Sequence, residues 1–320
     1  MAGVDGSHES MRAAALACDL AEASGVDIHL VHATKDLWSA IKHVSLVAAR
    51  RTSASPSEDL SLLHQKTIRA AHSRIAALLN QSLLATAADN LDVQIGRAAT
   101  VLERKAKAVG AGLVVVGGKH HKALGRWLGG GTALHLLHTI DTSVLVTGGA
   151  ATSINRILVA ADFSEGAPFA VSVAEQYARL LDASMRLMHV VEPLPSGAEQ
   201  SPGLSQEWFF TLSAEVLDEF LWHGVTLPAA DRVVRQGHIL PSIAGEVREW
   251  RADLLVVGSR GIGRVESRVP GSTTEALLND LPTSLLIVPL ACATEAQAAK
   301  PHQSVQRAQD PTTSTARSLR

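Results

Sequence analysis

The chain contains the same series of segments twice, and this internal repeat limits the possible fold more than any other feature. The matching segments are 5–7 and 162–164, 30–33 and 187–190, 112–118 and 253–259, and 142–146 and 283–287. The first two pairs are 157 residues apart and the last two are 141 residues apart. The first copy therefore has 16 additional residues between its second and third strands.

Short continuous apolar runs indicate that each copy is an α/β domain. Runs such as Leu113–Val116, Ile157–Ala160 and Leu285–Val288 are typical of parallel strands covered on both faces. A domain has roughly 150 residues, so we predict two domains, at residues 1–150 and 151–291. Residues 292–320 are polar and lack periodicity, which predicts a disordered tail.

A glycine-rich segment of the second copy has the composition of a phosphate-binding loop. Gly258, Gly261, Gly271 and Ser272 have the spacing G-x2-G-x9-G-[ST], directly after the apolar run Leu254–Val257. Glycine allows sharp turns and lets backbone amides approach an anion. The helix predicted to begin near Ser272 would direct its free amides and its positive dipole end at the same anion.

Two better-known phosphate loops do not fit this segment. A Walker A loop requires Lys and Ser or Thr where the chain has Arg264 and Val265. A dinucleotide-binding fingerprint requires a final glycine where the chain has Glu266, and it occurs after the first strand of a domain. The loop is therefore of a different type.

Together with Asp162 in ILVAADFSE and His189-Val190 in RLMHVVEP, this loop resembles the universal stress protein family, in particular its nucleotide-binding branch. The resemblance covers about residues 1–290 as two tandem copies. It implies two Rossmann-like domains, each an open five-stranded parallel sheet with helices on both faces. It also implies that ATP binds at the carboxyl ends of strands one, two and four, where such sheets reverse their strand order.

The resemblance implies a role for each matching residue of the second copy. Asp162 would face adenine and ribose, and Val190 would contact adenine through its backbone. The other positions are Ala160 at the ribose, Val257 and Gly258 at the ribose and phosphates, and Gly261, Gly271, Ser272 and Thr273 at the triphosphate. Mg²⁺ would arrive bound to the phosphates. No residue is assigned as a catalytic group or as a metal ligand.

The first copy differs from the family pattern at this loop. His120 stands where the second copy has Gly261, and Gly131 replaces Ser272, whereas Thr132 retains a hydroxyl. Lysines and arginines around His120 make the segment basic. One interpretation is that histidine donates to a phosphate. We favour the other, that the loop has lost nucleotide binding and its charges are solvated, so the predicted site lies in the second copy alone.

The first strand is short, because only three residues separate Met1 from Asp5, whereas Arg156–Ala161 precede Asp162. Either the natural start lies upstream, or the edge of the first copy's pocket is weakened. The sequence leaves both open.

Composition excludes several function classes. No apolar run approaches the ~18 residues of a membrane span, and no leader-like segment precedes the first domain, so we expect a cytoplasmic protein. Cys18 and Cys292 are the only cysteines and predict no disulfide or metal framework. The adjacent His120 and His121 would point apart and are poor zinc ligands. A net charge of −2 gives no reason to expect nucleic-acid binding.

Helical periodicity occupies the region between the second and third strands of each copy. Leu60–Leu84 and Glu207–Leu221 have apolar residues at helical spacing, and Ser55-Pro56 and Ser201-Pro202 offer helix starts. The second of these helices concentrates aromatic residues. We interpret it as a helix packed on its sheet, with a lid or partner surface as the alternative. His32 and His189 occupy equivalent positions, which favours a structural role over catalysis.

Three functions are compatible with these features. The leading one is an ATP-binding regulatory module with an unidentified protein partner and at most slow ATP hydrolysis. The second is a nucleotide-free interaction scaffold, and the least favoured is an ATP-using adenylating enzyme, whose SGGxDS loop is matched only faintly by Ala2–Ser7. Because members of the family commonly dimerise through the last strand, Val144–Thr147 and Leu285–Val288 could pair within the chain as a pseudo-dimer. Whether the chain also forms a homodimer is left open.

Overall fold

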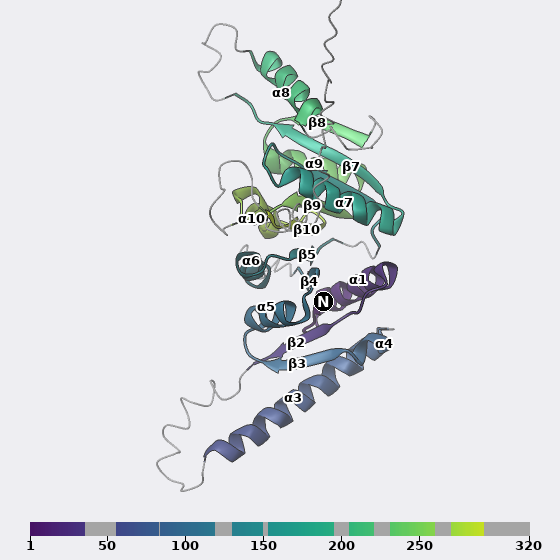
Figure 1. Ribbon diagram of the computed structural model, residues 1–320, viewed down its shortest axis with the longest axis vertical. Coiled ribbons are helices and arrows are strands. Elements are labelled where there is room, and N and C mark those ends of the chain that lie inside the picture. The colour runs from purple at the N-terminus through teal and green to yellow at the C-terminus, as the bar shows by residue number, and fades with distance from the viewer. Residues whose placement is uncertain are drawn as a thin grey trace, which may run out of the picture.

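The computed structural model describes residues 1–35, 56–82, 84–118, 130–149, 153–194, 205–220, 231–259 and 270–290. Residues 1–149 form the N-terminal lobe and residues 153–290 the C-terminal lobe, which lie one above the other in Figure 1. The predicted tail at 292–320, the loop glycine Gly261 and the residues around His120 all lie outside the described residues.

Each lobe alternates strands with helices, as its apolar runs predict. The strands are β1 (Ala2–Gly3), β2 (Leu30–Thr34), β3 (Leu91–Ile95), β4 (Leu113–Gly117), β5 (Ser143–Thr147), β6 (Arg156–Ala160), β7 (Ser184–Val191), β8 (Arg232–Gln236), β9 (Leu254–Gly258) and β10 (Ser284–Val288). The helices are α1 (His8–Ser24), α3 (Pro56–Gln81), α4 (Ala85–Ala88), α5 (Ala98–Val109), α6 (Gly130–Thr139), α7 (Ala167–Leu181), α8 (Gln206–Phe220), α9 (Ile239–Trp250) and α10 (Ser272–Asn279).

The strands form one continuous sheet of ten, in the order β3-β2-β1-β4-β5-β10-β9-β6-β7-β8. Within each lobe the five strands are parallel, and the order reverses at the first strand of the lobe. The lobes meet where β5 and β10 pair antiparallel, with Leu145 opposite Leu286. The chain thus forms two tandem Rossmann-like units, which confirms the predicted fold class.

Equivalent elements preserve the two sequence offsets. Helices α5 and α9 both have 12 residues and begin 141 residues apart, at Ala98 and Ile239. The last three strands of each lobe keep the same offset. The additional residues of the N-terminal lobe lie between β2 and β3, where α3 has 26 residues against 15 in α8. The repeat predicted from sequence is therefore a repeat of structure.

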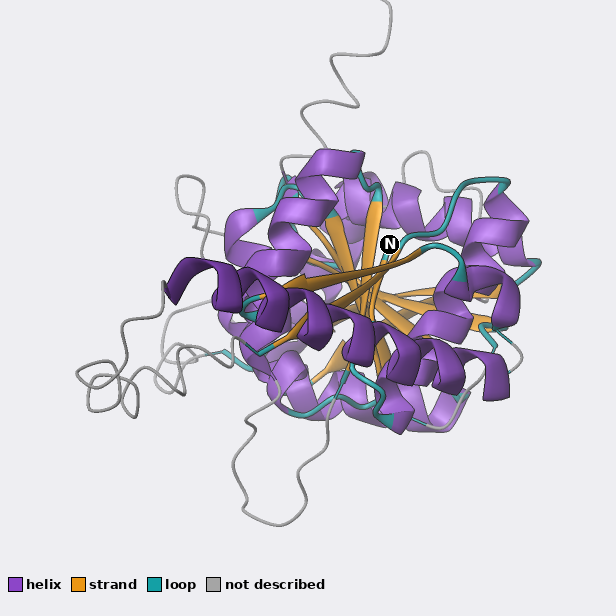
Figure 2. Ribbon diagram, turned by 90° about the horizontal axis from the view of Figure 1, so that it is seen from below, coloured by secondary structure: helices purple, strands orange, loops and turns teal. Residues whose placement is uncertain are grey.

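Helices cover both faces of the sheet, and Figure 2 shows the strands enclosed by them. One apolar cluster joins the sheet to α1, α3, α4 and α7, and a second joins it to α5, α6, α9 and α10. Both clusters include residues of both lobes, among them Leu145 and Leu286 in the first and Val144 and Leu285 in the second. The hydrophobic core is therefore continuous across the β5–β10 seam.

Close packing at the seam and beneath α1 explains why glycine occupies positions 117 and 118. A Cβ atom at Gly117 would lie 2.8 Å from the backbone of Glu9 and Ser10. At Gly118 it would lie 2.6 Å from Leu281 Cδ1 and 2.7 Å from the carbonyl oxygen of Thr147. Larger side chains do not fit without movement of backbone, so these glycines allow α1 and the C-terminal lobe to approach β4.

Several local predictions differ from the structure in detail. Strand β1 is only two residues long, as the short segment before Asp5 predicts. Helix α3 begins at Pro56, and α8 as described begins at Gln206, where Ser205 Oγ accepts a hydrogen bond of 3.0 Å from the Trp208 amide. Ser55, Ser201 and Pro202 lie outside the described residues.

Helix α8, the helix that is rich in aromatic residues, leaves several of its apolar side chains exposed. Trp208, Leu212 and Val216 lie four residues apart on α8 and are 47%, 38% and 42% exposed. These three side chains do not pack on the sheet, a detail that the prediction of a helix packed on its sheet did not include. Cys18 is a half-buried free thiol, and Cys292 lies outside the described residues. Among the described helices, none has the length and hydropathy that a membrane span requires.

Candidate functional site

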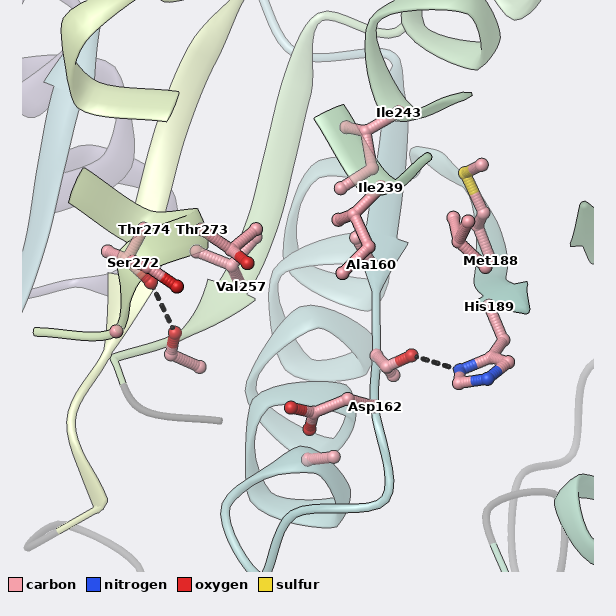
Figure 3. Close-up of a pocket in the computed structure, with 15 residues that line it drawn as sticks. Ala160, Asp162, Met188, His189, Ile239, Ile243, Val257, Ser272, Thr273 and Thr274 are labelled. Atoms are coloured by element: carbon pink, nitrogen blue, oxygen red, sulfur yellow. Dashed lines mark hydrogen bonds between the residues drawn. The ribbon is translucent and has the colours of Figure 1, made fainter. Parts of the chain in front are cut away.

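A cavity of about 160 Å³ opens at the carboxyl ends of β6, β7 and β9. It lies where the strand order of the C-terminal lobe reverses, which is the usual ligand position in open α/β sheets. Figure 3 shows Ser272, Thr273 and Thr274 on one side, Met188 and His189 on the other, and Ala160 and Asp162 between them.

The structure brings eight of the nine predicted site residues to this one cavity. They come from the ends of three strands and the start of one helix: Ala160, Asp162, Val190, Val257, Gly258, Gly271, Ser272 and Thr273. The ninth, Gly261, lies outside the described residues. Their assignment as ligand contacts remains a prediction, but their convergence from segments up to 113 residues apart is a property of the fold.

Sequence reasoning missed the apolar wall of the cavity. Ile239 and Ile243 of α9 and Met188 of β7 line it, and Ile243 and Met188 are almost fully buried. The i, i+4 spacing of the two isoleucines at the start of α9 was the available signal. Together with Val257 they form an apolar wall of the cavity.

Asp162 and His189 shape the loop that follows β6. The Ser164 amide donates to Asp162 Oδ1 at 3.0 Å, which closes the turn. His189 Nδ1 lies 2.8 Å from the carbonyl oxygen of Ala161, and its ring packs against Phe163 at 4.8 Å between centroids. A carbonyl oxygen only accepts, so Nδ1 carries the hydrogen. Burial lowers the pKa of His189, which favours the neutral ring.

The same contact exists in the N-terminal lobe. His32 Nδ1 lies 2.7 Å from the carbonyl oxygen of Val4, and the Ser7 amide donates to Asp5 Oδ1 at 2.9 Å. In both lobes the histidine thus joins the end of the second strand to the end of the first. This geometry agrees with the structural role predicted from the equivalent positions of the two histidines.

Helix α10 presents its first turn to the cavity. Gly271 is its N-cap residue, with φ −65° and ψ 153°, and makes no side-chain cap. The Gly271 amide donates to the Ser259 carbonyl oxygen at 2.9 Å, and Thr274 Oγ1 donates to the Gly258 carbonyl oxygen at 3.0 Å. These bonds fix the helix start against β9. First-turn amides have no acceptor within their helix, so this end suits an anion.

An ionic cluster behind the cavity anchors α9 to the sheet. The Glu246 carboxylate is buried, with 1% of its side chain exposed, and accepts from Arg186 Nη1 at 2.8 Å and Arg235 Nε at 2.9 Å. Burial alone raises the pKa of Glu246, but hydrogen bonds from Arg235 and Arg186 outweigh it and lower that pKa. Arg186 also lies 4.6 Å from the ring of Trp250. The cluster thereby positions the helix that carries Ile239 and Ile243.

The described residues hold no group of three or more His, Cys, Asp or Glu side chains arranged to bind a metal ion.

The fold and the cavity define a tandem α/β protein with a ligand-type cavity at a switch point of its sheet. The model of the universal stress protein family matches residues 1–148 and 153–289, so the chain belongs to this family. The family predicted from the motifs is thereby confirmed.

Similar proteins agree with this assignment. A universal stress protein of Thermus aquaticus, encoded in the 3' region of a QAH/OAS sulfhydrylase gene, is 29% identical over 133 residues, or 41% of this chain and 96% of that protein. A universal stress protein structure from Archaeoglobus fulgidus aligns with TM-score 0.58 and 16% identity, over 90% of this chain and 96% of that one. A functionally unknown Pseudomonas aeruginosa protein aligns with TM-score 0.53 and 15% identity, over 88% and 90%. These structures show the shared fold.

Proposed function

We propose that the protein is an ATP-binding regulatory module of the stress response, and that its C-terminal lobe holds ATP with Mg²⁺ bound through the phosphates. The observation that carries this proposal is the convergence of Asp162, Val190, Gly258, Ser272 and Thr273 on one cavity at the switch point. The resemblance of the motifs assigns nucleotide contacts to these positions. Their common location supports a single ligand for all of them.

The chemistry of the lining residues supports an orientation of ATP in which adenine lies on the apolar wall and the phosphates lie at the start of α10. Adenine would lie against Val190, Val257 and Ile239. Asp162 Oδ1 accepts from the Ser164 amide, and Oδ2 has no protein donor among the described residues, so it is suited to accept from a ribose hydroxyl. The phosphates would lie at the first turn of α10, where amides and the hydroxyls of Ser272 and Thr273 can donate.

Hydrolysis is expected to be slow. Efficient hydrolysis needs a base or a group that orients water beside the γ-phosphate. Among the described lining residues the only carboxylate is Asp162, which lies at the adenine and ribose end. His189 directs Nδ1 at the Ala161 carbonyl oxygen. We therefore expect ATP to act mainly as a bound regulator.

The connection from α10 to the seam supports a way for occupancy to change the surface of the protein. Helix α10 packs against α6 of the other lobe, and Leu281, just beyond its end, contacts Gly118. Ser284 Oγ also lies 3.2 Å from both the amide nitrogen and the carbonyl oxygen of Gly148. A ligand that holds the first turn of α10 would restrain these contacts, and a protein partner would read the result.

Calorimetric titration with ATP, ADP and cyclic AMP in the presence of Mg²⁺ tests the proposal. We expect one ATP per chain, and Asp162→Ala should weaken binding roughly tenfold or more, because a hydrogen bond to a charged group contributes about 1.5–3 kcal/mol. Asp5→Ala is the matched control, since it removes the equivalent turn contact from the N-terminal lobe. Gly261→His, which copies His120 of the first repeat, should also abolish binding.

Absence of ATP binding to the wild-type protein at millimolar concentration would contradict the proposal and leave the nucleotide-free scaffold. Equal weakening by Asp5→Ala and Asp162→Ala would show a general loss of folding rather than a site in the C-terminal lobe. The proposal places the protein in the cytoplasm, where ATP is abundant, and fractionation of cells that express the full chain would test that location.

A further inference from the structure

The N-terminal lobe has its own cavity at the position equivalent to the proposed ATP site. It opens at the carboxyl ends of β1, β2 and β4, and its volume is about 410 Å³, against about 160 Å³ in the C-terminal lobe. Asp5, Gly117 and Thr132 line it, and these residues correspond to Asp162, Gly258 and Thr273 of the other lobe. The cavity is thus retained by the fold, although the loop sequence beside it has changed.

Smaller wall residues are consistent with the greater volume of the N-terminal cavity. Four positions of the lining are reduced in the N-terminal lobe: Gly3 for Ala160, Val31 for Met188, Ala33 for Val190 and Ala98 for Ile239. The change at Ala98 is the most consequential, because it removes most of a side chain from the first residue of the helix that walls the cavity. The apolar wall of the N-terminal cavity therefore has smaller side chains at these four positions.

The polar groups of this cavity also differ from those of its counterpart. Arg97 lines the cavity, is exposed, and forms no ion pair within the described residues, whereas the C-terminal lobe has His238 at this position. His135, in place of Ala276, also lines the cavity, and its Nε2 lies 3.1 Å from Glu103 Oε2. Gly131 removes the hydroxyl that Ser272 provides in the other lobe. The N-terminal cavity thus combines a larger, mainly apolar interior with one exposed guanidinium in its lining.

We propose that this cavity is a second ligand site, which binds a phosphate ester of a ring system larger than adenine, with Arg97 paired to the phosphate. The wider interior accommodates the larger ring, and a guanidinium matches phosphate geometry better than an imidazole does. The two lobes then bind different ligands on one sheet. This inference concerns the N-terminal lobe alone and does not depend on ATP binding in the C-terminal lobe.

Flavin mononucleotide is a suitable probe, because its ring system has three fused rings, it carries one phosphate, and it is fluorescent. Titration of the full chain should show one flavin mononucleotide per chain. Riboflavin, which lacks the phosphate, should bind roughly three- to tenfold more weakly, because the lost pair is exposed and screened by salt. Adenosine monophosphate should compete poorly with the flavin for this cavity.

Two substitutions assign the probe to the cavity. Ala98→Ile restores the bulk of the narrow lobe and should weaken flavin mononucleotide binding about tenfold or more. Arg97→Gln should reduce its affinity to that of riboflavin, and Arg97→Lys should recover part of the difference. Arg179→Gln removes an exposed cation from the other lobe, 69% exposed, and should have no effect. Unfolding curves of each variant check that it folds, and ATP titration of the same samples reports the C-terminal site separately.

The proposal is overturned if flavin mononucleotide fails to bind at millimolar concentration. It is also overturned if Ala98→Ile binds the probe as well as the wild type does. Binding that is lost in Asp162→Ala and retained in Ala98→Ile would place the flavin in the C-terminal lobe and would likewise overturn it.

Discussion

The two lobes have the same strand order, the same histidine contact and the same position of their cavities, but different cavity walls. Ile239 and Met188 narrow the cavity of the C-terminal lobe, where Ala98 and Val31 leave that of the N-terminal lobe open. Ala98 and Ile239 begin equivalent helices, and Val31 and Met188 lie within equivalent strands. The fold thus preserves a cavity at the same place in both lobes, whereas the side chains on the cavity wall differ.

The same contrast extends to the ionic pairs behind each cavity. In the C-terminal lobe, strand arginines hold the helix carboxylate of Glu246. In the N-terminal lobe the charges are reversed, because Lys105, at the position of Glu246, pairs with Asp92 of β3 at 2.9 Å. Glu246 is buried, whereas Lys105 and Asp92 are 23% and 32% exposed. We therefore expect α9 of the C-terminal lobe to be held more firmly than α5 of the N-terminal lobe.

The largest loss of stability is expected when the hydrophobic core that both lobes share at the β5–β10 seam is disrupted. Leu286 lies in the middle of β10, is 1% exposed, and faces Leu145 across the seam. Leu286→Asp buries an unpaired charge in a core that both lobes use, and should cost more than about 4 kcal/mol of unfolding free energy. Hydrogen exchange should show loss of protection in both lobes. Loss confined to the C-terminal lobe would contradict a continuous core, and Leu286→Val is the mild control.

The next largest loss of stability is expected at the ionic cluster of Glu246, and it can be compared with the loss at the Lys105–Asp92 pair. Glu246→Leu leaves Arg186 without a carboxylate, whereas Arg235 keeps Glu249 at 2.9 Å. The substitution should destabilise the protein by about 2 kcal/mol, because removal of one partner of a largely buried cluster leaves a charge without its partner. Lys105→Leu breaks a more exposed pair and should cost about 1 kcal/mol or less. Urea unfolding of both variants measures the difference. Equal losses would show that the two helix walls are held alike.

Glu246→Leu should also weaken ATP binding, because α9 carries Ile239 and Ile243. Under the same conditions Lys105→Leu should leave ATP binding unchanged, since it acts on the other lobe. This second readout separates positioning of the cavity wall from stability alone.

Much of this architecture could be predicted from the sequence, because repeats and apolar runs are local signals. The two offsets located equivalent strands, and the motif around Gly258 predicted a ligand site at the end of a strand, where the structure has a cavity. The apolar wall could not be predicted in the same way. Ile239 and Met188 are ordinary core residues in sequence, and only the fold directs them into a cavity. The difference between Ile239 and Ala98 becomes a difference between two cavity walls only in the structure, where each residue lines its own cavity.

Two other features were beyond sequence reasoning. The periodicity of Glu207–Leu221 predicted α8 but not its exposed face, since helical spacing identifies an apolar stripe without showing what covers it. The cluster around Glu246 joins residues 60 positions apart on two strands and a helix. Charged residues at such distances give no pattern along the chain.

A smaller change in stability is expected when the pH is lowered, and this change tests the role of His189 in the C-terminal lobe. Burial lowers the pKa of His189, so the unfolded chain binds a proton at higher pH than the folded chain does. Stability should therefore fall as pH decreases below about 6.5, the ordinary value for histidine. Urea unfolding between pH 7.5 and about pH 5.5 measures this slope, in a window above the titration of most carboxylates.

His189→Asn keeps a donor for the Ala161 carbonyl oxygen and removes the proton-binding site, so it should flatten that slope. A slope that is unchanged in His189→Asn would assign the effect to other groups. His32→Asn removes the equivalent ring from the N-terminal lobe and shows how much of any stability loss comes from packing alone.

The smallest change in stability is expected at the first turns of α6 and α10, where Gly131 of the N-terminal lobe corresponds to Ser272 of the C-terminal lobe. Gly131 is exposed, and a Cβ atom there would meet nothing within 4 Å, so Gly131→Ser should fit without strain. Serine has a higher helix propensity than glycine, and the substitution should stabilise the protein by about 0.5 kcal/mol. Ser272→Gly should cost a similar amount and, in addition, weaken ATP binding by removing a hydroxyl donor.

Thermal unfolding and ATP titration of the two single variants and of the double variant separate these contributions. If the helix starts differ only in propensity, the double variant should recover wild-type stability, because the sites lie in different lobes and distant effects add. It should still bind ATP weakly, since the serine in the N-terminal lobe cannot reach the phosphates of a ligand in the other cavity. Recovery of ATP binding in the double variant would instead mean that ATP can use the N-terminal cavity, and that the wide cavity is not reserved for a larger ring.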